Sequence, residues 1–111
     1  MKTITVPKSK KAQALLDYDK CPEELLFEIN LSKEEFDSLW KANFFTYLNS
    51  ICNVHIDDYE SEEITNQNSI ALAIKDMENT KWPNNLKNLI TEIIGLFIKA
   101  KKSETGVYFY F

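Results

Sequence analysis

The residues best suited to chemistry are concentrated in one segment, residues 54–63, which contains the only histidine of the chain. His55 is followed closely by Asp57 and Asp58, and a histidine with carboxylate neighbours can act as a general base or hold a metal ion. Asp57 and Glu60 could also exchange protons as a carboxylate pair. A small enzyme that uses His55 with Asp57 or Asp58 is therefore one hypothesis for this chain.

The rest of the sequence contains no motif that supports such a site. There is no HExxH or CxxC pattern to supply further metal ligands, and the acidic segment lacks the glycine and ligand order of an EF-hand loop. Only two glycines occur, Gly95 and Gly106, so the glycine-rich loops that bind nucleotides are missing. We expect no catalytic residues, no metal and no cofactor, and interpret His55 as a surface or partly buried histidine.

The charge pattern of the segment favours a binding surface. Residues 57–63 carry five carboxylates and no cation, and lysine is absent between Lys41 and Lys75. Closely spaced carboxylates attract and select a basic protein, and an aromatic residue among them gives an interface an anchor. A solvated acidic loop is the simpler alternative. We call this segment the acidic strip; its candidate partner-binding residues are Asp57, Asp58, Tyr59, Glu60, Glu62 and Glu63.

The overall composition limits the kinds of partner. The formal net charge is −4, and the chain has no arginine, the residue that reads phosphates and bases most often. We therefore do not expect nucleic-acid binding. Apolar stretches are too short for a membrane span or a signal peptide. We expect a cytosolic protein with Cys21 and Cys52 reduced, at least one of them in the core.

The pattern of apolar residues predicts an α+β fold in one domain, residues 1–111. Alternation of apolar and polar residues, together with β-branched and aromatic content, predicts three strands. These are residues 2–6, 25–31 and 107–111. The last of them is rich in aromatics and would invite aggregation if it stayed unpaired, so we expect it to pair with one or both of the others.

Apolar spacings of three and four residues predict three or four helices that cover this sheet. A short helix lies within residues 8–19, and a long one begins at the capping box of Ser32 and Glu35 and continues through residue 51. Asn53 is a plausible left-handed end for it. A third helix follows an N-cap at Asn68, and a fourth occupies residues 86–102. The conformation of residues 54–67 remains open, because its beginning could be extended or the preceding helix could continue through Tyr59.

Part of the chain resembles a known family. Residues 49–60, followed by an amphipathic C-terminal helix and the ending 105–111, are similar to small bacterial immunity proteins that accompany polymorphic toxins, including those of contact-dependent growth inhibition systems. The resemblance covers roughly the last two thirds of the chain. It implies a non-enzymatic inhibitor that binds a cognate toxin domain, often a nuclease, in the cytosol of the producing cell, with the acidic strip as the contact region.

Two other classes remain open beside this resemblance. The enzyme hypothesis predicts a concave pocket around His55. A small adaptor or regulatory domain would use the same acidic face, and a toxin gene directly upstream would favour immunity over that alternative. Residues 108–111 could join an interface, although sheet core is the more common role of such a strand. The chain is expected to be a monomer or a weak dimer.

Overall fold

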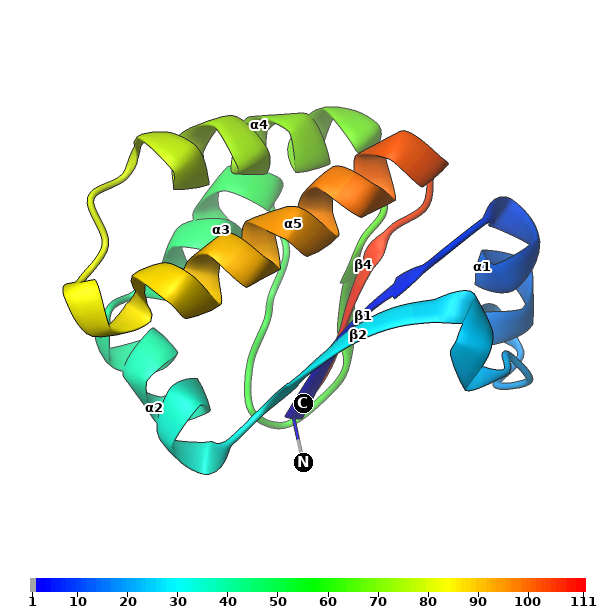
Figure 1. Ribbon diagram of the computed structural model, residues 1–111, viewed down its shortest axis with the longest axis horizontal. Helices are drawn as coiled ribbons and strands as arrows, with labels where there is room; N and C mark the ends of the chain where they lie inside the picture. Colours follow the sequence, from blue (N-terminus) through cyan, green and yellow to red (C-terminus); the bar gives the residue numbers. More distant parts are fainter. Residues whose placement is uncertain (1) are drawn as a thin grey trace.

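The first strand of the chain forms the middle of a four-stranded sheet. The computed structural model describes residues 2–111, in which the strand order is β2-β1-β4-β3 and all neighbours are antiparallel. The strands are β1 Lys2–Pro7, β2 Leu26–Leu31, β3 Glu62–Ile64 and β4 Val107–Tyr110. Both ends of the chain therefore meet in the sheet, as Figure 1 shows. The three predicted strands are confirmed.

The fourth strand, β3, was not predicted. It has three residues, two of them glutamates, so the sequence shows neither the length nor the alternation expected of a strand. It forms because β4 offers an edge for pairing, with Glu62 opposite Phe109 and Ile64 opposite Val107. Ile64 is buried. The prediction of three strands was too low by one in the described part of the chain.

Residues 2–111 contain five α-helices and two short 3-10 helices, where we predicted three or four helices. The α-helices are α1 Lys10–Asp17, α2 Lys33–Lys41, α3 Phe44–Cys52, α4 Gln67–Asn79 and α5 Lys87–Ser103, and the 3-10 helices span Glu23–Leu25 and Asn84–Leu86. Helices α2 to α5 gather on one side of the sheet and α1 lies apart from them (Figure 1). The fold class is α+β, as predicted.

The prediction of one long helix from the Ser32 capping box through residue 51 is wrong, because this stretch is broken into α2 and α3. The break lies at Asn43, whose φ of 62° is left-handed. Asparagine adopts this conformation more readily than most residues. Phe44 and Phe45 follow directly, and both are fully buried. Side chains of consecutive residues on a helix point about 100° apart, so two adjacent rings do not face the same way. The change in the direction of the helix axis at Asn43 helps α3 to bury both rings.

The ends of the other helices follow the predictions with one exception. Ser32 and Glu35 form the capping box at the start of α2, and Asn53 ends α3 with a φ of 54°. Helix α4 begins earlier than predicted. Its N-cap is Asn66 in place of Asn68, because the side chain of Asn66 accepts a hydrogen bond from the backbone N–H of Ser69.

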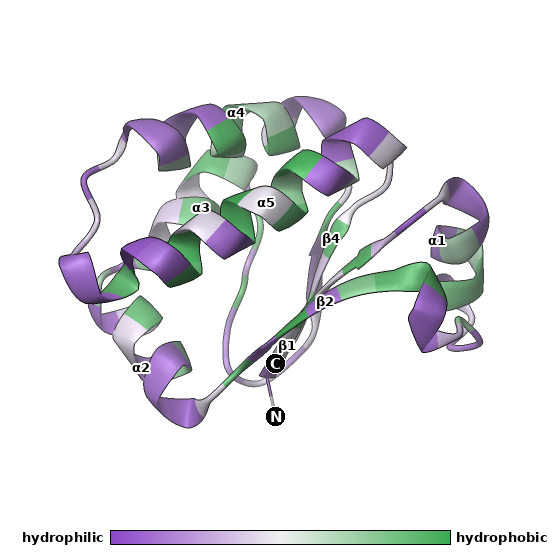
Figure 2. Cartoon of the chain, viewed as in Figure 1, coloured by the Kyte–Doolittle hydropathy of each residue, from purple (hydrophilic) through white to green (hydrophobic). Residues whose placement is uncertain are grey.

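The core lies between the helices and the inner face of the sheet. Ile4 and Phe109 lie opposite each other on β1 and β4, and both are fully buried. Phe111 continues this row into an aromatic cluster, with its ring centroid 5.0 Å from that of Phe36 and 5.2 Å from that of Phe45. Figure 2 shows apolar and hydrophilic positions alternating along α5, and its buried residues include Ile90, Ile93 and Phe97.

The outer face of the sheet is polar and carries α1. Thr5 lies opposite Glu28 on one side and Tyr108 on the other, and its hydroxyl donates to Glu28 at 3.3 Å. The phenol of Tyr108 donates to Asp17 of α1 at 3.1 Å. These bonds fix α1 to the sheet through polar groups, whereas the inner face is held by apolar packing.

Two further expectations concern redox state and membranes. Cys21 and Cys52 are free thiols, and Cys52 is buried, as predicted. Burial raises the pKa of the Cys52 thiol to about 11, so it stays protonated and unreactive at neutral pH. Among the helices of residues 2–111, none combines the length and the apolar content that crossing a membrane requires.

The left-handed backbone of Asn43 gives a test of the helix break. Replacing Asn43 by alanine should lower the free energy of unfolding by about 1 kcal/mol, and replacing it by glycine should leave it unchanged or raise it. Urea denaturation measures both. Ser50→Ala, an exposed change on α3, serves as the control and should stay within about 0.5 kcal/mol. Equal stability of the alanine and glycine variants would contradict the left-handed assignment.

Candidate acidic binding site

The acidic strip is held to the domain by a clamp just before it. The side chain of Asn49 on α3 accepts from the backbone N–H of Ile56 at 2.7 Å and donates to its carbonyl at 3.1 Å. Ile56 is buried. Residues 54–56 are therefore irregular and do not continue helix α3, and within the segment that the sequence left open only Glu62–Ile64 forms a strand.

Two carboxylates of the strip support its own backbone. Asp57 accepts from the backbone N–H of Tyr59 at 2.8 Å and of Glu60 at 3.1 Å, which closes a tight turn of the kind that aspartate favours. Asp58 forms an ion pair with Lys2. Lys2 also donates to the carbonyl of Phe111 at 3.1 Å, so this pair ties the strip to both ends of the chain.

Glu62 also supports the strip, whereas Glu63 is free to interact. The carboxylate of Glu62 accepts from the backbone N–H of His55 at 3.0 Å and of Glu63 at 2.9 Å. Glu63 is exposed and lies opposite Tyr108 on β4, so its side chain is on the outer face of the sheet. The sequence does not distinguish the two glutamates, and the structure separates their roles.

The exposed part of the strip is smaller than the sequence suggested. Tyr59 is 92% exposed, and Glu60 and Glu63 are exposed as well. Because Asp57, Asp58 and Glu62 already hold backbone groups or Lys2, they contribute charge but are less free to move toward a partner. Asp58 is exposed too, but it is paired with Lys2. Tyr59, Glu60 and Glu63 are therefore the residues that a partner can contact without breaking bonds within the chain.

The structure adds two aspartates to the strip that sequence analysis missed. A surface groove of about 210 Å³ separates the end of α1 from β3 and the outer face of β4. We call it the acidic groove. It is lined by Leu16, Asp17, Asp19, Ser61, Glu62, Glu63, Tyr108 and Tyr110. Its ionisable acids come from two segments more than forty residues apart in sequence, and no cation is among the lining residues.

Two tyrosines form the wall of the acidic groove on β4. Their rings are stacked, with centroids 6.2 Å apart and an angle of 24° between the planes. The phenol of Tyr108 is also the acceptor for the side-chain amide of Gln13 at 3.1 Å. Burial raises the pKa of Tyr108 well above its usual value. The neutral ring of Tyr108 is buried and supports the ring of Tyr110, which is partly exposed beside the carboxylates.

The acidic groove gives Tyr110 a distinct titration. Burial is the main cause that raises the pKa of its phenol, to about 12, and the negative charges of Asp19 and Glu63 raise it further. A neutral phenol is favoured wherever desolvation and like charge disfavour the phenolate. The phenol of Tyr110 is thus a sensitive reporter of the charge inside the groove.

One signal in the sequence could have indicated part of this groove. Tyrosine alternates with phenylalanine at the end of the chain, so the polar-tipped rings of Tyr108 and Tyr110 had to lie on the opposite face from Phe109 and Phe111. We assigned the whole strand to the sheet core. The contributions of Asp17 and Asp19 had no such signal, because α1 reaches the strip only through the fold.

His55 does not lie in a pocket of the kind the enzyme hypothesis predicts. It is exposed, and the five surface pockets described for residues 2–111 are lined by other residues. Within the same residues, no group of three His, Cys, Asp or Glu side chains is placed to hold a metal ion. The geometry therefore adds no support for chemistry at His55.

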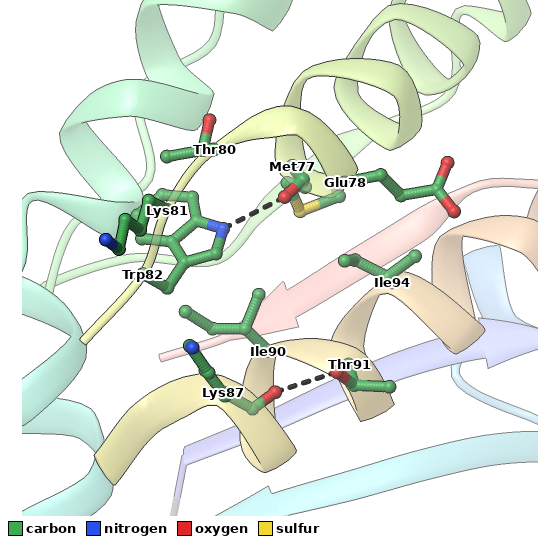
Figure 3. Close-up of a pocket in the computed structure, with 9 residues that line it drawn as sticks. All are labelled: Met77, Glu78, Thr80, Lys81, Trp82, Lys87, Ile90, Thr91 and Ile94. Atoms are coloured by element: carbon green, nitrogen blue, oxygen red, sulfur yellow. Dashed lines mark hydrogen bonds between the residues drawn. The ribbon is translucent and has the colours of Figure 1, made fainter. Parts of the chain in front are cut away.

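A second concave surface lies between the end of α4 and the start of α5 (Figure 3). It has a volume of about 440 Å³. Trp82 forms one wall, where its indole N–H donates to the carbonyl of Met77 at 3.0 Å. The charged residues among those lining it are Glu78, Lys81 and Lys87, so its charges partly cancel. The acidic groove is the stronger candidate, because its lining contains four carboxylates and no cation.

Comparisons with known proteins do not place this chain in a family. Searches against protein-family models, curated proteins and solved structures found no match. The resemblance to immunity proteins therefore remains a hypothesis that depends on the residues quoted for it.

The charge inside the acidic groove can be tested through Tyr110. The absorbance titration of the wild type minus that of Tyr110→Phe should show a phenol with a pKa near 12. Glu63→Gln and Asp19→Asn should each lower this pKa, because each removes a nearby negative charge. Glu34→Gln on α2 is the matched control and should leave it unchanged. A pKa of Tyr110 that ignores both groove substitutions would contradict the described geometry.

Proposed function

We propose that this chain is an immunity protein that binds and neutralises a cognate toxin domain through its acidic groove and acidic strip. The observation that carries the proposal is the convergence of Asp17 and Asp19 with Glu62 and Glu63 around two tyrosine rings. The toxin domain is expected to be basic, as nucleases commonly are where they bind phosphate. The chain would act in the cytosol of the producing cell, without a cofactor.

The composition of this surface suits tight recognition of a basic protein. Carboxylates that pair with lysine or arginine form charge-assisted hydrogen bonds, which are stronger than neutral ones. Tyr110, which is partly exposed, presents its ring beside these carboxylates, and a cationic side chain is attracted to an aromatic face. The acidic groove, at about 210 Å³, is large enough to admit one lysine or arginine side chain of the partner.

The strip around the groove is pre-organised for binding. The bonds of Asn49, Asp57 and Glu62 to backbone groups already hold it in one conformation. A surface that is ordered before binding loses less conformational entropy when a partner arrives. Tyr59 extends from this ordered loop almost fully exposed, and it supplies an aromatic anchor that charge alone does not give.

Inhibition then follows from occupying the basic surface of the toxin. A nuclease binds the phosphate groups of its substrate with a cationic cleft, and an acidic protein surface can compete for that cleft. The same charge speeds the encounter of the two proteins, which matters where a toxin must be captured before it acts. A non-catalytic adaptor with the same acidic face is the alternative, and the identity of the captured partner distinguishes the two.

The first test is capture of the predicted partner. The tagged chain, co-expressed with the product of the neighbouring upstream gene, should retain a basic protein fragment in a one-to-one complex. Raising the salt concentration from about 0.05 M to about 0.5 M should weaken the complex, because exposed charges are screened. If the upstream product is not retained at either salt concentration while the chain itself is folded, the immunity proposal is contradicted.

The second test separates the acidic groove from charge in general. The triple variant Asp19→Asn, Glu60→Gln and Glu63→Gln should bind the upstream product roughly tenfold or more weakly, mainly through a slower association rate. Surface plasmon resonance measures both rates. The matched triple variant Glu34→Gln, Glu78→Gln and Glu104→Gln removes the same charge elsewhere and should bind nearly as the wild type does. Equal losses in both variants would show that net charge, and not this surface, decides the affinity.

A further inference from the structure

One edge of the sheet is left open by the fold. Strand β2 is the terminal strand of the order β2-β1-β4-β3, so β1 pairs with only one of its sides. Lys8 follows β1 and lies opposite Leu25, because Pro7 is paired with Leu26. The backbone N–H of Lys8 donates to the carbonyl of Leu25 at 2.9 Å, so these two residues form a hydrogen-bonded pair. Because such pairs alternate along antiparallel strands, Phe27 and Ile29 also bond to β1. The backbone groups of Glu28 and Asn30 therefore point away from the sheet.

The opposite edge of the sheet is protected. Strand β3 spans only Glu62–Ile64, and the backbone N–H of Glu63 is already bonded to the side chain of Glu62 at 2.9 Å. A short edge with an occupied donor gives little opportunity for another strand to pair. Strand β2, with six residues, is twice as long and lacks this protection.

A groove beside β2 accompanies the open edge. Its volume is about 440 Å³, and it lies between β2 and α5 on the inner face of the sheet. Phe27, Ile29 and Leu96 give it an apolar floor, and Gly95 on α5 opens it, since a Cβ atom there would meet nothing within 4 Å. An added strand could thus bond to the edge and cover apolar side chains that β2 leaves partly exposed.

We infer that this open edge pairs with β2 of a second copy of the chain, in an antiparallel dimer whose two-fold axis passes beside Ile29. In this register Ile29 faces Ile29 of the second copy, and Phe27 faces Leu31. Each Glu28 faces Asn30 and exchanges both backbone hydrogen bonds with it, because these are the residues with free outward groups. Apolar residues then meet apolar residues on the inner face, and polar residues meet on the outer face.

The neighbouring registers fit less well. A shift of one residue would place the polar face of one strand against the apolar face of the other. An axis beside Glu28 would keep the faces matched, but it would set two Glu28 carboxylates directly opposite each other, which is unfavourable. The register centred on Ile29 avoids both faults, so the charges of β2 select it.

The exposed stripe of α5 is also complementary to itself. Glu92 and Lys99 lie on the side of α5 that lines the groove, one on each side of Gly95. Helix α5 packs on β1 and β2, so a two-fold axis at the edge of β2 brings two copies of α5 side by side and antiparallel. Glu92 of one copy then approaches Lys99 of the other. Gly95, at the centre, keeps the space between the helices free.

The dimer is independent of the proposed function. The acidic groove lies at β3 and β4, on the far side of β1 from β2. Both acidic grooves of a dimer would therefore remain open to partners. Capture of a toxin could fail while the dimer exists, and the dimer could be absent while a toxin is captured, so the two ideas are tested separately.

A pair of substitutions at Asn30 tests the inference. Asn30→Glu sets like charges opposite each other at both Glu28 pairs, and Asn30→Lys sets opposite charges there. Both replace Asn30, whose amide oxygen accepts a bond from the hydroxyl of Thr3 at 2.9 Å, by a long and flexible charged side chain, so they are similar in size and opposite in charge. The full chain would be measured by sedimentation equilibrium from about 1 μM to about 500 μM, with circular dichroism to confirm folding.

The wild type should reach twice its monomer mass of 13.0 kDa within this concentration range. Asn30→Glu should raise the dimer dissociation constant roughly tenfold, and Asn30→Lys should lower it by a similar factor. Glu92→Lys should weaken the dimer, and adding Lys99→Glu should restore it. A wild type that stays at 13.0 kDa throughout, or Asn30→Glu and Asn30→Lys variants with equal dissociation constants, would overturn the inference.

Discussion

The pairing of β1 with β4 is the constraint on which the rest of the structure depends. It joins residues about a hundred positions apart, so its closure costs much chain entropy, which the burial of Ile4 and Phe109 must offset. Once it forms, β2 can add only beside β1 and β3 only beside β4. The same register fixes which residues face the helices and which face outward, and it thereby sets the positions of Tyr108 and Tyr110.

This constraint also decides what the acidic strip can do. Because β3 pairs with β4, the strip is drawn against the C-terminal strand, and Asp58 meets Lys2 at the other end of the chain. Some carboxylates are then committed to holding the loop. Others are left to act on a partner, together with aspartates of α1 that only the fold brings near. A charge count along the sequence does not separate these roles, since it carries no information on hydrogen bonding.

The two edges of the sheet face the same physical constraint, but one is protected and the other is open. Unpaired strand edges attract other strands, so a soluble domain must protect them or use them. At β3 the edge is short, and Glu62 occupies its donor. At β2 the edge is longer, flanked by an apolar groove and a self-complementary charge pattern. The surface proposed to bind a basic toxin and the edge proposed to form a dimer therefore lie at opposite ends of the sheet.

The sequence by itself determined the elements whose signals are local. Alternation in residues 2–6 and 25–31, the Ser32 capping box and the left-handed end at Asn53 each depend on neighbours within a few residues, and each was predicted correctly. Only the tertiary structure decided the break at Asn43, the strand β3 and the union of α1 with the acidic strip. One physical reason explains why the sequence did not predict these three features. Each gains its stability from residues distant in the chain, and local propensity carries no information on such contacts.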